Sequence, residues 1–132
     1  MLDPDVTLAL IAHIRAQCPD LVTVDEAPFA EPIDHFDAQT PAALVYLAED
    51  AAAAEVDTVR PVQRIGMTYG VWLVCKREDF RAQRHALRAA VFGWVPSEAH
   101  EPFAYRGGTM NDIRGDLIWW REFWTVDTWL RG

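Results

Sequence analysis

The sequence predicts an α+β fold, in which an antiparallel or mixed sheet of about four to five strands carries two helices packed on one face. Three observations lead to this prediction. The chain has 132 residues and 51% of them are hydrophobic, which is enough apolar material for one domain with its own core. Two stretches repeat apolar residues at helical spacing, and several others have the composition or alternation of β-strands. The elements run helix, strand, strand, strand, helix, strand, strand, and we expect a single domain over residues 1–132.

The first helix is expected to begin at Asp3-Pro4-Asp5, with Asp3 as the N-cap and Pro4 at the first helical position. Apolar residues then recur every fourth position, at Val6, Leu10, Ile14 and Cys18. Pro19 closes this helix, because the residue before a proline disfavours helical backbone. Residues 21–24 form a short β-like run.

Residues 25–41 are acidic and contain three prolines, so they predict an ordered loop or an extended arm. The apolar run over residues 42–47 has the length of a strand. The stretch from Glu49 to Asp57 is rich in alanine and acidic residues, and we expect it to be a loop that projects between two strands.

The clearest strand runs from Gln63 to Cys75, where the odd-numbered positions are almost wholly apolar. Such alternation predicts a strand with one face on the core. The even-numbered positions are small or polar until Trp72. Gly66 and Gly70 lie among them and indicate a bend or a close neighbour over that face.

The second helix is expected to run from Asp79, as its cap, to about Phe92, and to end at Gly93. Its buried stripe comprises Phe80, Leu87, Val91 and Trp94. The opposite face carries the cationic or titratable side chains Arg81, Arg84, His85 and Arg88. This basic face is either solvated or a docking surface for an acidic partner.

Residues 93–102 are expected to be a loop, and residues 103–114 a small hairpin in which Gly107-Gly108 and Asn111-Asp112 supply the turns. The last strand, residues 117–130, has large apolar side chains on both faces. Its odd-numbered positions include Trp119, Arg121, Phe123 and Trp129. A small domain has little chain to cover a second apolar face, so that face is buried either by another subunit or by the loops 25–41 and 93–102.

Charge is divided unevenly along the chain, which has a formal net charge of −8. Residues 1–60 contain twelve acidic and two basic residues, and residues 61–132 contain eight acidic and ten basic ones. The overall acidity argues against bulk nucleic-acid binding. The asymmetry fits head-to-tail packing of like subunits, or simply an acidic first half.

The sequence carries no recognisable catalytic, cofactor or metal signature. Cys18 and Cys75 form no CxxC pair and are expected to be reduced and buried. The cluster Asp34-His35-Phe36-Asp37 offers too few metal ligands and is expected to be a solvated loop. Ser97 and His100 resemble a nucleophile and its base, but no oxyanion-hole pattern accompanies them. We therefore expect no enzyme activity, no cofactor and no metal.

The sequence also contains no apolar run near the roughly 20 residues that cross a bilayer. Its acidic start, Met1-Leu2-Asp3-Pro4-Asp5, lacks the basic residues of a signal peptide. We expect no membrane partner, and a location in the cytoplasm or in a particle assembled there.

The later two-thirds of the chain resembles the tail terminator proteins of long-tailed bacteriophages and prophages. The resemblance lies in the strand at 62–74, a helix that ends in "Phe-Gly-Trp-Val-Pro" (92–96), the run "Phe-Ala-Tyr-Arg-Gly-Gly" (103–108) and a final aromatic strand at 117–130. The first forty residues match this family only in general pattern. The shared motifs are structural, and the family has no invariant active residues to carry over.

The resemblance implies a virion protein that forms a six-subunit ring on the head-proximal end of the tail tube. Such a ring stops tube polymerisation and joins the head connector, without a cofactor. The implied partners are further copies of this chain, the tail tube protein and the head–tail connector protein, while DNA only passes through the lumen. Assembly is expected in the host cytoplasm. Candidate interface residues are Arg81, Arg84 and Arg88, expected to meet acidic residues of a neighbour's 25–57 region, together with Trp119, Arg121, Phe123 and Trp129.

Three other functions fit the same sequence. The chain is alternatively another head–tail joining or tail component of the virion. A second alternative is a small-ligand binding domain that uses the tryptophan-rich face of the sheet. The third is a minor hydrolase that uses His100 or the 34–37 cluster.

Overall fold

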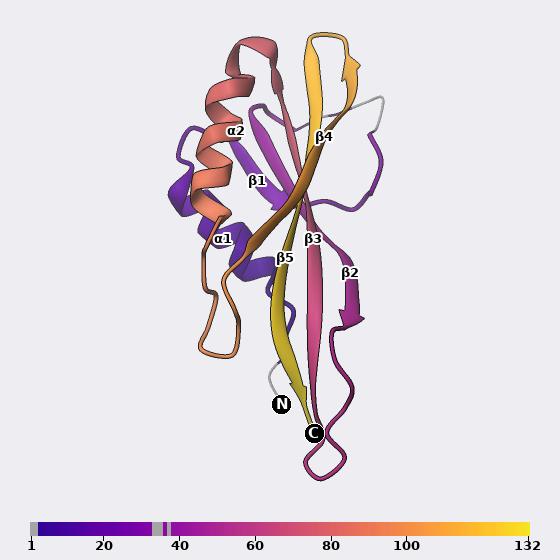
Figure 1. The fold of residues 1–132 in the computed structure, drawn as a ribbon. Helices are drawn as coiled ribbons and strands as arrows, with labels where there is room; N and C mark the ends of the chain where they lie inside the picture. Colours follow the sequence, from indigo (N-terminus) through magenta and orange to yellow (C-terminus); the bar gives the residue numbers. More distant parts are fainter. Residues whose placement is uncertain (1–2, 33–35, 37) are drawn as a thin grey trace.

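A computed structural model describes residues 3–32, 36 and 38–132, and within them it contains two α-helices and one five-stranded sheet (Figure 1). In chain order the elements are α1 (Thr7–Gln17), β1 (Thr23–Glu26), β2 (Ala42–Ala52), β3 (Val62–Lys76), α2 (Arg77–Val91), β4 (Ala104–Arg114) and β5 (Leu117–Arg131). None of the helices that the model describes is long and apolar enough to cross a membrane.

The sheet is mixed, and its strands are ordered β1-β2-β3-β5-β4. β1 runs parallel to β2, whereas the other neighbouring strands are antiparallel. Both helices lie on one side of the sheet in Figure 1, and their buried residues share one cluster with the odd-numbered residues of β3. The predicted α+β fold, with a mixed sheet and two helices, is confirmed.

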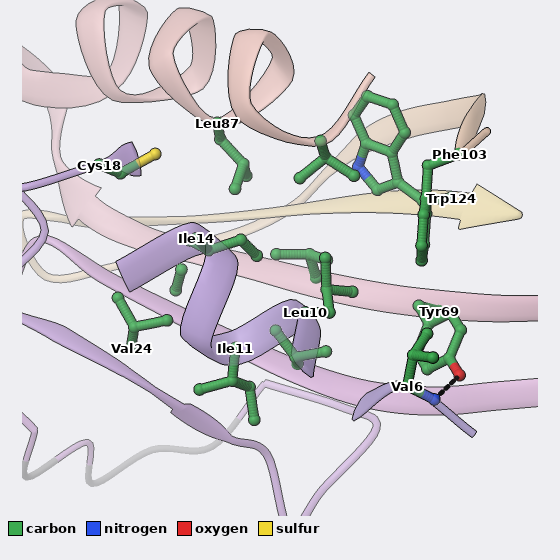
Figure 2. Packing of buried hydrophobic residues seen from close by; sticks show 14 of the residues in the cluster. Val6, Leu10, Ile11, Ile14, Cys18, Val24, Tyr69, Leu87, Phe103 and Trp124 are labelled. Carbon is green, nitrogen blue, oxygen red and sulfur yellow. Dashed lines mark hydrogen bonds between the residues drawn. The ribbon is translucent and has the colours of Figure 1, made fainter. Parts of the chain in front are cut away.

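The main core fills the space between the helices and the sheet. The predicted stripe of α1 is buried, and Leu87 and Val91 of α2 pack into the same cluster. At one end of this core the Tyr69 hydroxyl accepts a hydrogen bond from the Val6 N–H at 2.9 Å (Figure 2). The same hydroxyl donates to Asp5 Oδ1 at 2.9 Å. These two bonds fix the entry of the chain into α1.

The predicted helix starts were wrong by a few residues. α1 begins at Thr7 rather than near Asp3, because Asp5 is held by Tyr69 and accepts hydrogen bonds from both the N–H and the hydroxyl of Thr7. Asp5 thus caps the helix from two residues before its first turn. α2 begins at Arg77 rather than at Asp79, since it follows β3 without a loop. The first short strand, expected at residues 21–24, lies at Thr23–Glu26, where it pairs with β2.

The stretch 49–57 is not wholly a loop, contrary to our prediction. β2 passes a bulge between Leu47 and Glu49 and continues to Ala52, which pairs with Ile65. Antiparallel pairing with β3 therefore overrides the polar, alanine-rich composition. Only residues 53–61 form the connecting loop, which we call the tip.

The predicted hairpin at 103–114 was also wrong, because β4 is one continuous strand over Ala104–Arg114. The glycines and the Asn-Asp pair mark two register shifts, between Tyr105 and Gly107 and between Met110 and Asp112. The chain reverses instead just after Arg114, where Gly115 has a φ of 63°. The hairpin is thus formed by β4 with β5.

One half of the sheet extends well beyond the helices. β3 and β5 run together to the end of the molecule at which the C-terminus lies, β2 accompanies them only as far as Ala52, and the tip is the far end of this extension (Figure 1). We call residues 48–70 and 123–131 the finger. Its strands pair fully, but most side chains of β2 in the finger are exposed.

Candidate assembly surface

No chemical site emerges from the described residues. They contain no group of three or more His, Cys, Asp or Glu side chains arranged to hold a metal ion, and the predicted loop cluster at 34, 35 and 37 lies outside them. Cys18 and Cys75 are free and buried, as expected. Burial raises the pKa of both thiols, that of Cys75 to about 11, so both are poor nucleophiles.

The Ser97 and His100 side chains do meet, with Oγ and Nδ1 2.7 Å apart. The other ring nitrogen of His100 lies 3.0 Å from the Pro4 carbonyl oxygen. The neighbouring Ala99 N–H donates to Ser97 Oγ itself, rather than being free to stabilise an oxyanion. These contacts tie the 97–100 loop to the N-terminal segment.

The second face of the sheet is partly covered by the chain's own loop. Trp119 is 1% exposed and packs edge-on against Trp72 and Phe36, with Phe29 beside it. Of our two explanations for this apolar face, coverage by the 25–41 loop holds for the part around Trp119. This packing fills the space that a small ligand would need over Trp72 and Trp119.

Arg121 fastens that loop. Its Nη1 donates to the Ala30 carbonyl at 2.6 Å and to the Tyr46 hydroxyl at 3.0 Å. Its guanidinium also lies over the rings of Trp72 and Phe123, at 4.6 and 4.9 Å from their centroids. The contacts that the structure gives Arg121 and Trp119 are thus made within this chain.

The remainder of the second face, on the finger, is open. The 93–102 loop does not cover it, because Glu101 and Ala99 hydrogen-bond to β5 residues 127 and 128 and its Trp94 packs in the main core. The open part presents half-exposed side chains, namely Thr68, Phe123, Thr125, Asp127 and Trp129. Phe123 also borders a groove of about 290 Å³ with Glu49 and Arg106. Trp129 borders a larger cavity, about 510 Å³, beside the N-terminal segment.

The predicted basic face of α2 is divided by the structure. Arg88 turns toward the sheet, where its Nε donates to the fully buried Glu122 at 2.9 Å and its Nη2 to the Tyr105 hydroxyl at 2.8 Å. Burial lowers the pKa of Arg88, but the bonds to Glu122 and Tyr105 outweigh it and raise that pKa. Arg84 lies over the rings of Phe80 and Trp120. Within residues 3–32, 36 and 38–132, neither Arg81 nor Arg84 forms an ion pair.

Glu122 is a buried hydrogen-bonding centre that the sequence did not reveal. It is 0% exposed and accepts hydrogen bonds from the indole N–H groups of Trp120 and Trp124 as well as from Arg88. The sequence signal that could have revealed Glu122 was an acidic residue within an apolar strand, in a chain whose second helix is basic. The apolar tip of the finger, with Val56 and Val59 exposed, was also missed, because we expected only that this loop would project.

Comparison with known proteins identifies the family. A model of the phage tail terminator protein family matches residues 2–132, essentially the whole chain. No curated protein matches the sequence. The family is one of structural virion proteins, in keeping with a fold whose exposed features are surfaces for packing. The chain belongs to the phage tail terminator family and has a structural role in a phage tail.

Proposed function

We propose that six copies of this chain close into a ring that caps the head-proximal end of the tail tube. The ring ends tube polymerisation, and its opposite rim joins the head connector. In this proposal the subunits assemble in the host cytoplasm and remain in the virion, while DNA passes through an acidic lumen. No cofactor and no catalysis are involved.

The observation that carries the proposal beyond the family is the open sheet face of the finger. Its aromatic side chains, Phe123 and Trp129, are only half buried, although both residues pair with β3. Large apolar side chains clustered on a soluble protein commonly mark a contact surface. A contact between unlike surfaces of identical subunits closes into a ring when the rotation per subunit is fixed.

Charge supports contacts between unlike surfaces. The acidic residues Glu49, Asp50 and Glu55 are exposed on the finger, whereas on α2 Arg81 is exposed and Arg84 is partly exposed. Opposite charges on separate regions steer one copy's finger toward the next copy's helix and penalise the pairing of like surfaces. We therefore retain Arg81, Arg84, Phe123 and Trp129 as proposed interface residues. Arg88 also stays a proposed interface residue, because it lines a groove between α2 and β4 with Phe92 and Tyr105.

Solution mass and imaging test this proposal. Light scattering across a wide concentration range, and electron microscopy with purified tail tubes, should detect a species six times the 15.0 kDa chain mass, or a cap on one end of each tube. A monomer that leaves tubes uncapped and able to elongate would refute termination. Binding along the tube wall, or only to the connector, would favour the alternative of another tail or head–tail joining component.

A further inference from the structure

The tip of the finger is a projection with exposed apolar and acidic side chains, and Arg60 is its one basic residue. Val59 is 88% exposed and Val56 is 50% exposed, and they alternate with the acidic residues Glu55 and Asp57. Exposed valines at the end of a projecting hairpin are poorly placed to contact their own core. They are well placed to enter a surface on another molecule.

The tip is held in one shape by its own hydrogen bonds. The Ala53 N–H donates to the Arg64 carbonyl and the Asp57 N–H to the Val62 carbonyl, each at 2.9 Å. The Asp57 carboxylate in turn accepts from the Val59 N–H at 2.9 Å, which makes a tight turn that presents Val59 outward. A projection that is already ordered loses less conformational entropy on binding than a flexible one.

A groove with matching chemistry lies between α2 and β4. It encloses about 370 Å³ and is lined by His85, Arg88, Ala89, Phe92, Tyr105 and Trp124. Phe92 is 69% exposed although it is a large apolar residue. The Arg88 guanidinium, 4.8 Å from the centre of the Tyr105 ring, brings a positive charge to one wall, which its ion pair with Glu122 partly offsets. Arg84, one turn earlier on α2, adds a second positive charge near this wall.

We propose that the tip of one copy docks into the α2–β4 groove of the next copy in the ring. Val59 packs on Phe92 and Tyr105, and the carboxylates of Glu55 and Asp57 face the cations of α2. In one chain the tip lies at the far end of the finger, away from α2 and β4 (Figure 1), so the contact forms between copies. Tip and groove are unlike surfaces, and their contact is therefore head-to-tail. This inference rests on the proposed ring and specifies the contact that closes it.

Cysteine cross-linking tests the contact directly. Val59→Cys places a thiol on the tip and Ala89→Cys places one in the groove, while both native cysteines are buried. A mixture of the two single variants should give a covalent dimer on mild oxidation. The double variant should give a ladder that stops at the ring size. Leu8→Cys, on α1 and 74% exposed, is the matched control that should not cross-link to Val59→Cys.

The outcomes separate this inference from the proposed function. Each reaction is run with and without tail tubes, and ring or cap formation is measured on the same samples. Rings or caps without a cross-link above the Leu8→Cys control would overturn the tip-in-groove contact and leave termination standing. Absence of both rings and caps would remove the proposed function itself. Cross-linking of Val59→Cys to the tube protein, rather than to a second copy, would also overturn the inference.

A charged substitution at the tip tests the same contact quantitatively. Val59→Asp places a charge where an apolar side chain is expected to be buried, so ring assembly should require a concentration at least about tenfold higher. The Asp57 carboxylate accepts from the backbone N–H of residue 59, which the substitution keeps, so this hydrogen bond should survive the change. Unchanged assembly of Val59→Asp, with unfolding identical to that of the unaltered chain, would contradict burial of the tip.

Discussion

Replacement of Glu122 by Gln should strongly destabilise the chain, although the two side chains have nearly the same shape. Glu122 Oε2 accepts from Arg88 Nε at 2.9 Å and from Trp120 Nε1 at 3.1 Å. Its Oε1 accepts from Trp124 Nε1 at 3.2 Å. A glutamine offers one acceptor oxygen in place of two, so at least one of these three donors must face an amide NH₂ group.

The expected loss in the free energy of unfolding follows from these three hydrogen bonds. In the most favourable orientation the amide oxygen keeps Arg88 and Trp120, and the buried indole N–H of Trp124 is left unpaired at about 1–3 kcal/mol. The two retained bonds lose the carboxylate charge, and charge-assisted bonds are roughly twice as strong as neutral ones. The Arg88 side chain is 39% exposed, so water compensates part of its loss. We expect Glu122→Gln to lower the free energy of unfolding by about 3 kcal/mol.

Urea denaturation, followed by circular dichroism, measures this change. Asp127→Asn is the matched control, because Asp127 lies on the same strand and pairs with Arg64 at 2.6 Å, but both side chains are substantially exposed. It should cost less than about 1 kcal/mol. If the two variants lost equal stability, each below about 1 kcal/mol, burial of the Arg88–Glu122 pair would not matter and our reasoning would be refuted.

Three further predictions concern the core and its titrating groups. Gly70→Ala should lower the free energy of unfolding by about 1–3 kcal/mol, because a Cβ atom there would lie 2.3 Å from Tyr46 Cζ, and thermal melts measure the loss. Burial raises the pKa of Asp5, but hydrogen bonds from Thr7 and Tyr69 lower it below 3.8 overall. The Asp5 carboxylate therefore stabilises the fold above pH 3.8, and this contribution is lost as pH falls through its native pKa. In Asp5→Asn the free energy of unfolding, measured as a function of pH, should fall less steeply at acidic pH. Thiol labelling at pH 8 should be about 100-fold slower at native Cys75 than in unfolded chain, since burial raises its pKa from 9.0 to about 11; equal rates would contradict its burial.

The sequence predicted elements best where one face is buried. β3 alternates up to Trp72 because its odd-numbered side chains pack under the helices, and α2 shows a clear apolar stripe for the same reason. The second half of β2 was missed because its side chains are exposed on the finger. A strand with no buried face carries no alternating apolar signal, and only its pairing with β3 defines it.

The prediction for β4 was wrong because glycine occurs both in turns and at positions where a neighbouring side chain leaves no room for a Cβ atom. We interpreted Gly107-Gly108 as a turn, but it follows the first register shift in a continuous strand. Gly108 has no side chain because a Cβ atom would lie 2.3 Å from the Trp120 ring. The ring comes from the neighbouring strand β5, and sequence patterns within residues 103–114 do not contain that information.

The sequence did not predict which side chains of the last strand stay exposed. Phe123 and Trp129 are half buried on the open finger. Trp119 and Arg121 looked equivalent to them in sequence. They are covered by Phe29, Ala30 and Phe36, which lie more than eighty residues earlier in the chain. Burial by a distant loop depends on tertiary structure, so the alternation of residues along the strand could not distinguish Trp119 and Arg121 from Phe123 and Trp129.

The fold separates the residues that stabilise the chain from those proposed to assemble it. The two buried clusters draw on the helices, the strand centres and the loop around Phe29, whereas the tip contributes no residue to either cluster. A change such as Val59→Asp therefore acts on an exposed side chain and should leave the free energy of unfolding nearly unchanged. A change at Glu122 acts on both stability and the groove, because Arg88 and Trp124 contact Glu122 and also line the groove. Loss of assembly in a tip variant that unfolds normally thus reports on the contact itself, while the same loss in Glu122→Gln does not.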